Sequence, residues 1–171
     1  MPGPPVLISS YADLVAYLEG DRVLHQADAA AKSVTIPTEQ KGIQGFQVIR
    51  WQDADGVVQF IQSMLREIPG DRMPVLESAV CRLNHALAWL GLDLNRAHGL
   101  LAFRVALPIF PRGAIEAREI QAAFRAAVKV GADLAPVLAR VVSGQIAPDA
   151  VIDEVRRVMA ASSSPPVHPI D

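Results

Sequence analysis

The chain has 171 residues, of which 51% are hydrophobic and 20% are charged, and its formal net charge is −2. This composition excludes a largely disordered protein, and the apolar runs are too short to cross a bilayer, so we expect no membrane span. The small negative charge argues against nucleic acid as the main partner, because phosphate binding needs a concentrated basic surface.

The cysteine content and the N-terminal residues indicate the compartment. Cys81 is the only cysteine, which excludes an intramolecular disulfide and the disulfide-stapled class of secreted scaffold. The opening residues, MPGPPVLISSYADL, lack the basic region and the long apolar stretch of a secretory signal. We therefore expect a cytoplasmic protein, and the proline- and glycine-rich residues 1–8 predict a flexible leader.

A short amphipathic helix is predicted to follow the N-cap candidates Ser9 and Ser10 and to end at Gly20. A helix of about ten residues is marginal alone, so it must pack on another element. Its apolar residues recur at helical spacing: Tyr11, Leu14, Val15 and Leu18.

Three β-type segments come next, the first of which we expect to end at Pro37. The loop at residues 53–56 contains Asp55-Gly56, a pair typical of tight hairpins, so the sheet is predicted to be antiparallel here. Its two aspartates also resemble part of a calcium loop, but the other oxygen ligands and the closing glutamate are missing. The three predicted strands are Ser33–Ile36, Phe46–Trp51 and Val57–Gln62.

The middle of the chain predicts a helix followed by two more strands. A broad apolar stripe indicates a helix over residues 75–90, with Gly91 as its stop. The strands are predicted at residues 92–94 and 100–107. In the second strand Arg104 lies opposite the apolar face, so we expect its face to meet solvent or a partner.

Two helices are predicted to end the chain. The first runs from residue 116 to about 142 and is expected to bend or split at Gly131 or Pro136. The element order, α-β-β-β-α-β-β-α plus a C-terminal helix, predicts an α+β fold with an antiparallel sheet. The predicted organisation is a leader at 1–8, one domain at 9–144, an additional C-terminal helix at 145–160 and a flexible tail at 161–171.

Catalytic chemistry has little support in the sequence. Cys81 and His85 share a helix face and could act as nucleophile and base, but no third orienting group is evident. Cys81 borders the apolar stripe, so we expect a packed cysteine. The four histidines are scattered, and no nucleophile-elbow, P-loop or dinucleotide-binding motif occurs. We therefore predict a non-enzymatic protein without a metal or a cofactor.

Some polar and aromatic residues keep two interpretations. Asn84 could cap a loop, bond across a dimer, or be an ordinary polar helix residue. Trp51 and Trp89 could be interface anchors or core residues. Arg118, Arg125 and Lys129 stand among glutamates at helical spacing and indicate a solvated helix face.

Two stretches carry a family pattern: LNHALAWLGLDLNRAHGLLAFRVALPIFP at residues 83–111 and APVLARVVSG at residues 135–144. A helix, a short strand, a glycine turn, an R-x-A-L strand and a long helix follow one another. This pattern resembles the YbjN-like family, which is grouped with bacterial sensory-transduction regulators and is similar in fold to type III secretion chaperones. The resemblance covers residues 9–144 and implies a chaperone-like α+β domain that is usually dimeric.

In secretion chaperones the dimer holds an unfolded partner segment by strand-edge pairing and apolar patches. The resemblance thus implies a non-enzymatic protein-interaction module, chaperone-like or regulatory, that binds an unidentified protein or peptide as a homodimer. The alternative is a small-molecule-sensing regulatory domain with an apolar pocket between sheet and helix. The positions that match the binding surfaces are Tyr11, Leu14, Leu18, Ile49 and Trp51.

Overall fold

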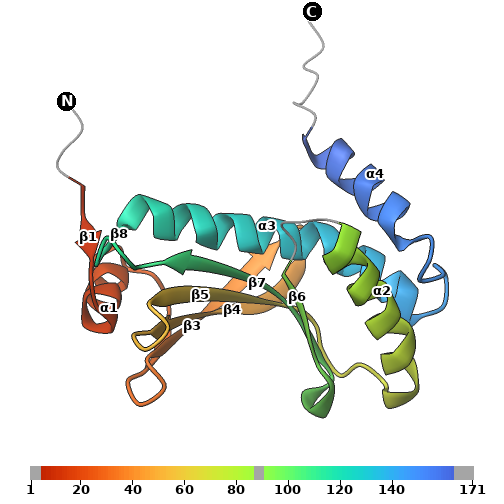
Figure 1. Cartoon of the computed structure of the whole chain (residues 1–171), viewed down its shortest axis with the longest axis horizontal. Coiled ribbons are helices and arrows are strands. Elements are labelled where there is room, and N and C mark those ends of the chain that lie inside the picture. The colour runs from red at the N-terminus through yellow and green to blue at the C-terminus, as the bar shows by residue number, and fades with distance from the viewer. Residues whose placement is uncertain (1–4, 87–90, 164–171) are drawn as a thin grey trace, which may run out of the picture.

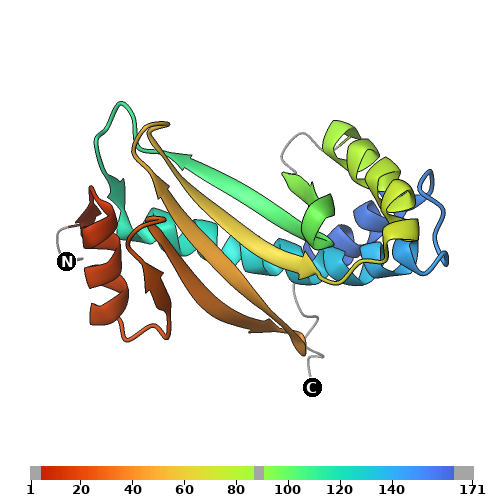
Figure 2. The same cartoon turned by 90° about the horizontal axis from the view of Figure 1, so that it is seen from below.

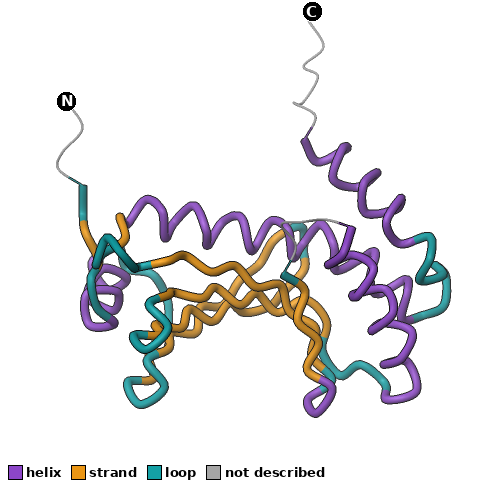
Figure 3. The backbone as a smooth tube through the Cα atoms, viewed as in Figure 1, coloured by secondary structure: helices purple, strands orange, loops and turns teal. Residues whose placement is uncertain are grey.

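The computed structural model describes residues 5–86 and 91–163 of the chain. One long helix, α3 (Ala117–Val142), lies across one face of a six-stranded antiparallel sheet (Figure 1, Figure 3). The predicted α+β class with an antiparallel sheet is confirmed. In spatial order the strands are β2 (Gln26–Asp28), β3 (Ser33–Gln40), β4 (Ile43–Gln52), β5 (Val57–Leu65), β7 (Leu100–Pro108) and β6 (Leu92–Asn95).

The other helices stand at the two ends of α3 (Figure 1). Helix α1 (Tyr11–Gly20) lies at the N-terminal end of α3, beside the short antiparallel pair β1 (Leu7–Ile8) and β8 (Ile115–Glu116). Helices α2 (Met73–Ala86) and α4 (Val151–Ser163) contact each other and α3 at its other end. Two short 3₁₀ turns complete the fold, Gly70–Arg72 and Arg96–His98.

Helix α1 begins where the N-cap candidates predict. The Oγ atom of Ser10 accepts a hydrogen bond from the backbone N–H of Asp13 at 3.1 Å, which satisfies one of the free donors of the first turn. Strand β1 starts inside the predicted leader, and its Ile8 is buried. The division of the chain into leader, domain, added helix and tail stays a prediction.

Strand β3 does not end at Pro37, as the sequence predicted, but runs through it to Gln40. Pro37 pairs with Phe46 of β4, whose N–H points the other way and bonds Ser63 Oγ at 2.9 Å. The nitrogen of Pro37 therefore faces away from β4, at the outer edge of the sheet. Strand β2 pairs only with residues 33–35 of β3, so the missing N–H of Pro37 leaves no ladder bond unmade.

The hairpin between β4 and β5 is confirmed, with residues 53–56 as its loop. Gly56 has φ +63°, and its N–H donates to Asp53 O at 3.2 Å. Along β5, Val58 and Phe60 lie buried beneath the helix layer. These two residues are two apart and therefore share one face of the strand.

Helix α2 buries a narrower stripe than the sequence predicted. Cys81 is exposed, so the prediction of a packed cysteine is wrong. Cys81 comes directly after Val80, which lies at the edge of the buried stripe. Because successive side chains are rotated by about 100° around the helix axis, Cys81 points away from the core. The predicted end of this helix and Trp89 fall at residues 87–90, outside the described residues. The buried residues of α2 are Met73, Leu76, Ala79, Val80 and Leu83.

Helix α3 is continuous, so the predicted split at Gly131 or Pro136 does not occur. Pro136 is exposed, whereas Gly131 is buried against the sheet. A Cβ atom at position 131 would lie 2.8 Å from Cγ of Gln62, so the absence of a side chain lets α3 approach β5 closely. The tight contact follows from one glycine.

Candidate functional site

One face of the sheet has no helix over it among the described elements. Figure 2 shows this face from below, with the strands in front of α3. Strand alternation decides which side chains it carries: on β4, Ile49 and Trp51 turn toward α3 and are buried, while Val48 and Arg50 turn to the open side. We call this the open face.

The open face contains a hollow of about 270 Å³ over β4, β5, β7 and β6. Five of the residues around it are apolar, and the others are polar or charged. The apolar group is Phe46, Val48, Ile61, Leu100 and Ala102. The polar group is Arg50, Gln59, Asp93, Asn95 and Arg104. An apolar floor with a few polar groups is the usual lining of a recognition surface.

The charges around this hollow are mainly positive. Arg104 pairs with Asp93 across β7 and β6 at 2.6 Å. The guanidinium of Arg66 lies 6.0 Å from the centre of the Phe46 ring, within the range of a cation–π contact. Within residues 5–86 and 91–163, neither Arg50 nor Arg66 forms a salt bridge, so two cations on this side are not neutralised.

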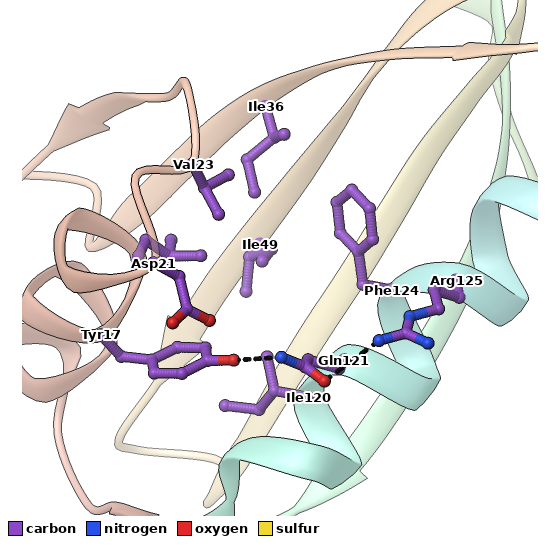
Figure 4. A pocket seen from close by; sticks show the side chains of 10 residues that line it. Tyr17, Asp21, Val23, Ile36, Ile49, Ile120, Gln121, Phe124 and Arg125 are labelled. Carbon is purple, nitrogen blue, oxygen red and sulfur yellow. Dashed lines mark hydrogen bonds between the residues drawn. The ribbon is translucent and has the colours of Figure 1, made fainter.

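A second cavity lies on the helix-covered side, between α1, α3 and the sheet (Figure 4). It encloses about 130 Å³. Its inner wall is apolar and comes from five different segments of the chain. These wall residues are Leu18, Val23, Ile36, Ile49, Ile120 and Phe124. We call this the α1–α3 pocket.

Four polar side chains stand at the α1–α3 pocket. Gln121 Nε2 donates to Tyr17 Oη at 2.6 Å, and Arg125 Nη2 donates to Gln121 Oε1 at 3.1 Å (Figure 4). Burial raises the pKa of Tyr17 above its usual value, and a hydrogen bond with the Asp21 carboxylate raises it further. The phenol therefore keeps its proton at neutral pH and remains a donor.

The five residues predicted to bind a partner are mostly inside the protein. Leu14, Leu18, Ile49 and Trp51 belong to the hydrophobic core, and Tyr11 is half-buried with its hydroxyl donating to Ser33 O at 3.2 Å. The structure places all five in or against one hydrophobic core, and of them Leu18 and Ile49 line the α1–α3 pocket. A role of these five in partner binding stays a prediction, and the open side of β4 carries other residues.

The remaining polar candidates have structural explanations or are exposed. Asn84 caps the loop before β6: its Nδ2 donates to Leu92 O at 2.9 Å, and its Oδ1 accepts from Leu92 N at 3.0 Å. Cys81 and His85 are both exposed on α2. In the described part of the chain, no three His, Cys, Asp or Glu side chains cluster as metal ligands would.

The sequence predicted, as an alternative, an apolar pocket between sheet and helix, and it predicted that the Arg104 face meets solvent or a partner, but it did not identify the residues that line either of these two cavities. The open face depends on which side of the sheet α3 covers, and strand alternation alone does not tell the two sides apart. The α1–α3 pocket joins Tyr17 to Gln121, which are 104 residues apart. Arg50 and Arg104 were the residues that indicated the open face, because each is the only charged residue of its strand.

A sequence model of the YbjN family, described as "Putative bacterial sensory transduction regulator", matches residues 16–140. The chain belongs to the YbjN family. The match spans α1 through most of α3, so both cavities of this YbjN protein lie within the family region. The resemblance seen in the sequence is confirmed.

Comparison with solved structures adds one similar fold, from the "Structure of the HopA1-SchA Chaperone-Effector Complex". The similarity has a TM-score of 0.43 and 13% sequence identity, and it covers 69% of this chain and 87% of that chain. No curated protein matches the YbjN chain. Among its described helices, none has both the length and the apolar character that a bilayer crossing requires.

Proposed function

We propose that this YbjN protein is a non-enzymatic, cytoplasmic interaction module, chaperone-like or regulatory, that binds a partner polypeptide on the open face and works as a homodimer. The observation that carries the proposal is the hollow of about 270 Å³ on the open face. A hollow on an uncovered sheet side that combines apolar and charged groups is typical of an interaction site. The homodimer rests on the family resemblance.

The charge of the hollow favours one class of partner. Arg50 and Arg66 have no carboxylate partner in the described part of the chain, and the floor around Val48 and Ile61 is apolar. A segment that carries acidic residues between apolar ones satisfies both features, because its carboxylates meet the guanidinium groups while its apolar side chains fill the hollow. We therefore assign an extended acidic–apolar peptide segment to the open face.

Binding at a sheet edge, which the chaperone resemblance implied, has less support. Pro37 offers no N–H at the outer edge of β3, and Asn84 occupies the outer N–H and C=O of Leu92 on β6. A peptide that added a strand at either of these positions would lack those bonds, and the remaining edge, the outer side of β2, is only three residues long. The open face is the better candidate surface.

The test is a peptide selection from a displayed random library against the purified full chain. Val48→Asp and Ile61→Asp place a carboxylate in the hollow, and Leu24→Asp, at an exposed apolar loop residue away from it, is the matched control. We expect selected peptides to combine acidic and apolar residues. They should bind Leu24→Asp like the unmodified protein and bind the other two at least tenfold more weakly.

Two results would overturn the proposal. One is selected peptides that bind Val48→Asp as tightly as the unmodified chain. The other is a library that yields no binder while Val48→Asp converts a dimer into a monomer in light scattering, since the open face would then be a subunit interface. A monomer at micromolar concentration in the unmodified protein would refute the homodimer alone.

A further inference from the structure

The role proposed for the open face does not account for the α1–α3 pocket. Its volume of about 130 Å³ is close to that of a known engineered cavity of about 150 Å³ that binds benzene. The inner wall is formed by branched aliphatic side chains and by Phe124. The pocket therefore accepts an apolar group of about four to six non-hydrogen atoms.

Opposite charges stand at the mouth of this pocket. Asp21, directly after α1, supplies a carboxylate, and Arg125, on α3, supplies a guanidinium (Figure 4). Both side chains are exposed, and within the described residues neither takes part in a salt bridge. Arg125 uses one of its five N–H donors in the hydrogen bond with Gln121, so the other N–H groups remain free to bind a ligand.

The groups between the two charges are fixed in place. Gln121 is held from both sides, since its amide nitrogen bonds Tyr17 Oη and its oxygen accepts from Arg125. Tyr17 Oη accepts from Gln121, and the nearby Asp21 carboxylate acts on the same phenol, whose pKa it raises. The mouth thus presents a positive end, a rigid polar middle and a negative end.

From this arrangement we infer that the α1–α3 pocket binds a free α-amino acid with a branched aliphatic or phenyl side chain. The ammonium group pairs with Asp21, the carboxylate pairs with Arg125, and the apolar side chain fills the pocket. A fatty acid would leave Asp21 opposite a like charge, and an amine would do the same to Arg125. Only a zwitterion with an apolar group meets both ends and the inner wall.

This site is independent of the open face. Ile49 of β4 lines the pocket, whereas its neighbours Val48 and Arg50 line the hollow on the other side of the same strand. The inference therefore does not need the proposed function to hold. The two sites can be tested by separate variants.

The test is isothermal titration of the full chain with defined probes. L-Leucine, L-isoleucine and L-phenylalanine are the candidate ligands, glycine lacks the side chain, L-leucinamide lacks the carboxylate, and 4-methylpentanoate lacks the ammonium. Arg125→Gln and Asp21→Asn remove one charge each. Arg118→Gln, on the exposed part of α3 next to Glu116, is the matched control.

We expect at least one of the three apolar amino acids to bind, and the three truncated probes to bind at least tenfold more weakly. Arg125→Gln and Asp21→Asn should weaken that amino acid by tenfold or more, while Arg118→Gln leaves it unchanged. All variants should keep the unmodified melting temperature, because the three residues are exposed. The inference would be overturned if none of the three amino acids bound at millimolar concentration. It would also be overturned if L-leucinamide and 4-methylpentanoate bound as tightly as L-leucine.

Discussion

Substituting Gly131 by alanine tests how closely α3 packs on the sheet. The added Cβ would lie 2.8 Å from Gln62 Cγ, a distance that side-chain carbons do not reach without a shift. Gln62 cannot move freely, since its Nε2 donates to Thr38 Oγ1 and to Ser63 O, both at 3.0 Å. Either the helix lifts from β5 or Gln62 gives up these bonds.

The expected loss of stability follows from three opposing effects. Alanine in place of glycine inside a helix gains about 1 kcal/mol. Overpacking a close contact costs about 1–3 kcal/mol, and a weakened buried hydrogen bond costs about 1 kcal/mol more. Gly131→Ala should therefore lower the free energy of unfolding by about 1–3 kcal/mol, which lowers the melting temperature by about 2–12 °C in a chain of this size.

Urea unfolding followed by circular dichroism measures this change. Gly20→Ala is the control, because Gly20 is also a helical glycine, the last residue of α1, and a Cβ there meets no atom within 4 Å. We expect that control to stay within about 0.5 kcal/mol of the unmodified protein. A Gly131→Ala protein that is as stable as the unmodified chain, with an unchanged denaturant slope, would refute the close contact.

Three further predictions concern other residues. Burial raises the pKa of Asp133, but Lys129 and Lys41, at 2.7 and 2.5 Å, outweigh it and hold that pKa below its usual value. Asp133→Asn should therefore cost about 1–2 kcal/mol at pH 7. In urea titrations this difference should begin to shrink as the pH falls below about 4, the ordinary pKa of an aspartate, and vanish only below the lowered pKa of folded Asp133, where the native carboxyl becomes protonated. Asn84→Ala should cost about 1 kcal/mol in the same assay, because two bonds to Leu92 are lost. Cys81 should react fully with a thiol reagent in the folded protein, and resistance would contradict its exposed position.

The regular elements were predictable because their signals are local. The apolar stripes of α2 and α3 and the Asp-Gly loop before β5 each lie within a short window of sequence. Strands β1 and β8 were missed because Leu7 and Ile8 pair with residues 115–116, more than a hundred residues away. A two-residue strand has no periodicity to detect, so only the tertiary structure defines it.

The candidate site was harder to predict because side-chain alternation identifies two faces of a strand but not which one is covered. On β4, Ile49 and Val48 are equally apolar, but Ile49, the residue predicted to bind a partner, is the one that is buried beneath α3. The charge of Arg50 marked the open side. An isolated arginine on an apolar strand is therefore a better guide to the uncovered face than the apolar residues are.

Two positions at the edges of the sheet, Pro37 on β3 beyond the end of β2 and Leu92 on β6, also bear on how this protein behaves when it is concentrated. A sheet edge with free N–H and C=O groups can recruit another copy, and repeated recruitment builds a fibril. Here Pro37 lacks the N–H that such a copy would need on β3, and the amide of Asn84 occupies the corresponding groups of Leu92 on β6. These two positions resist the addition of a strand beside the open face, while the short strand β2 leaves its outer side unpaired. A variant that lost both features would expose additional free N–H and C=O groups at the sheet edges, to which another copy could add a strand.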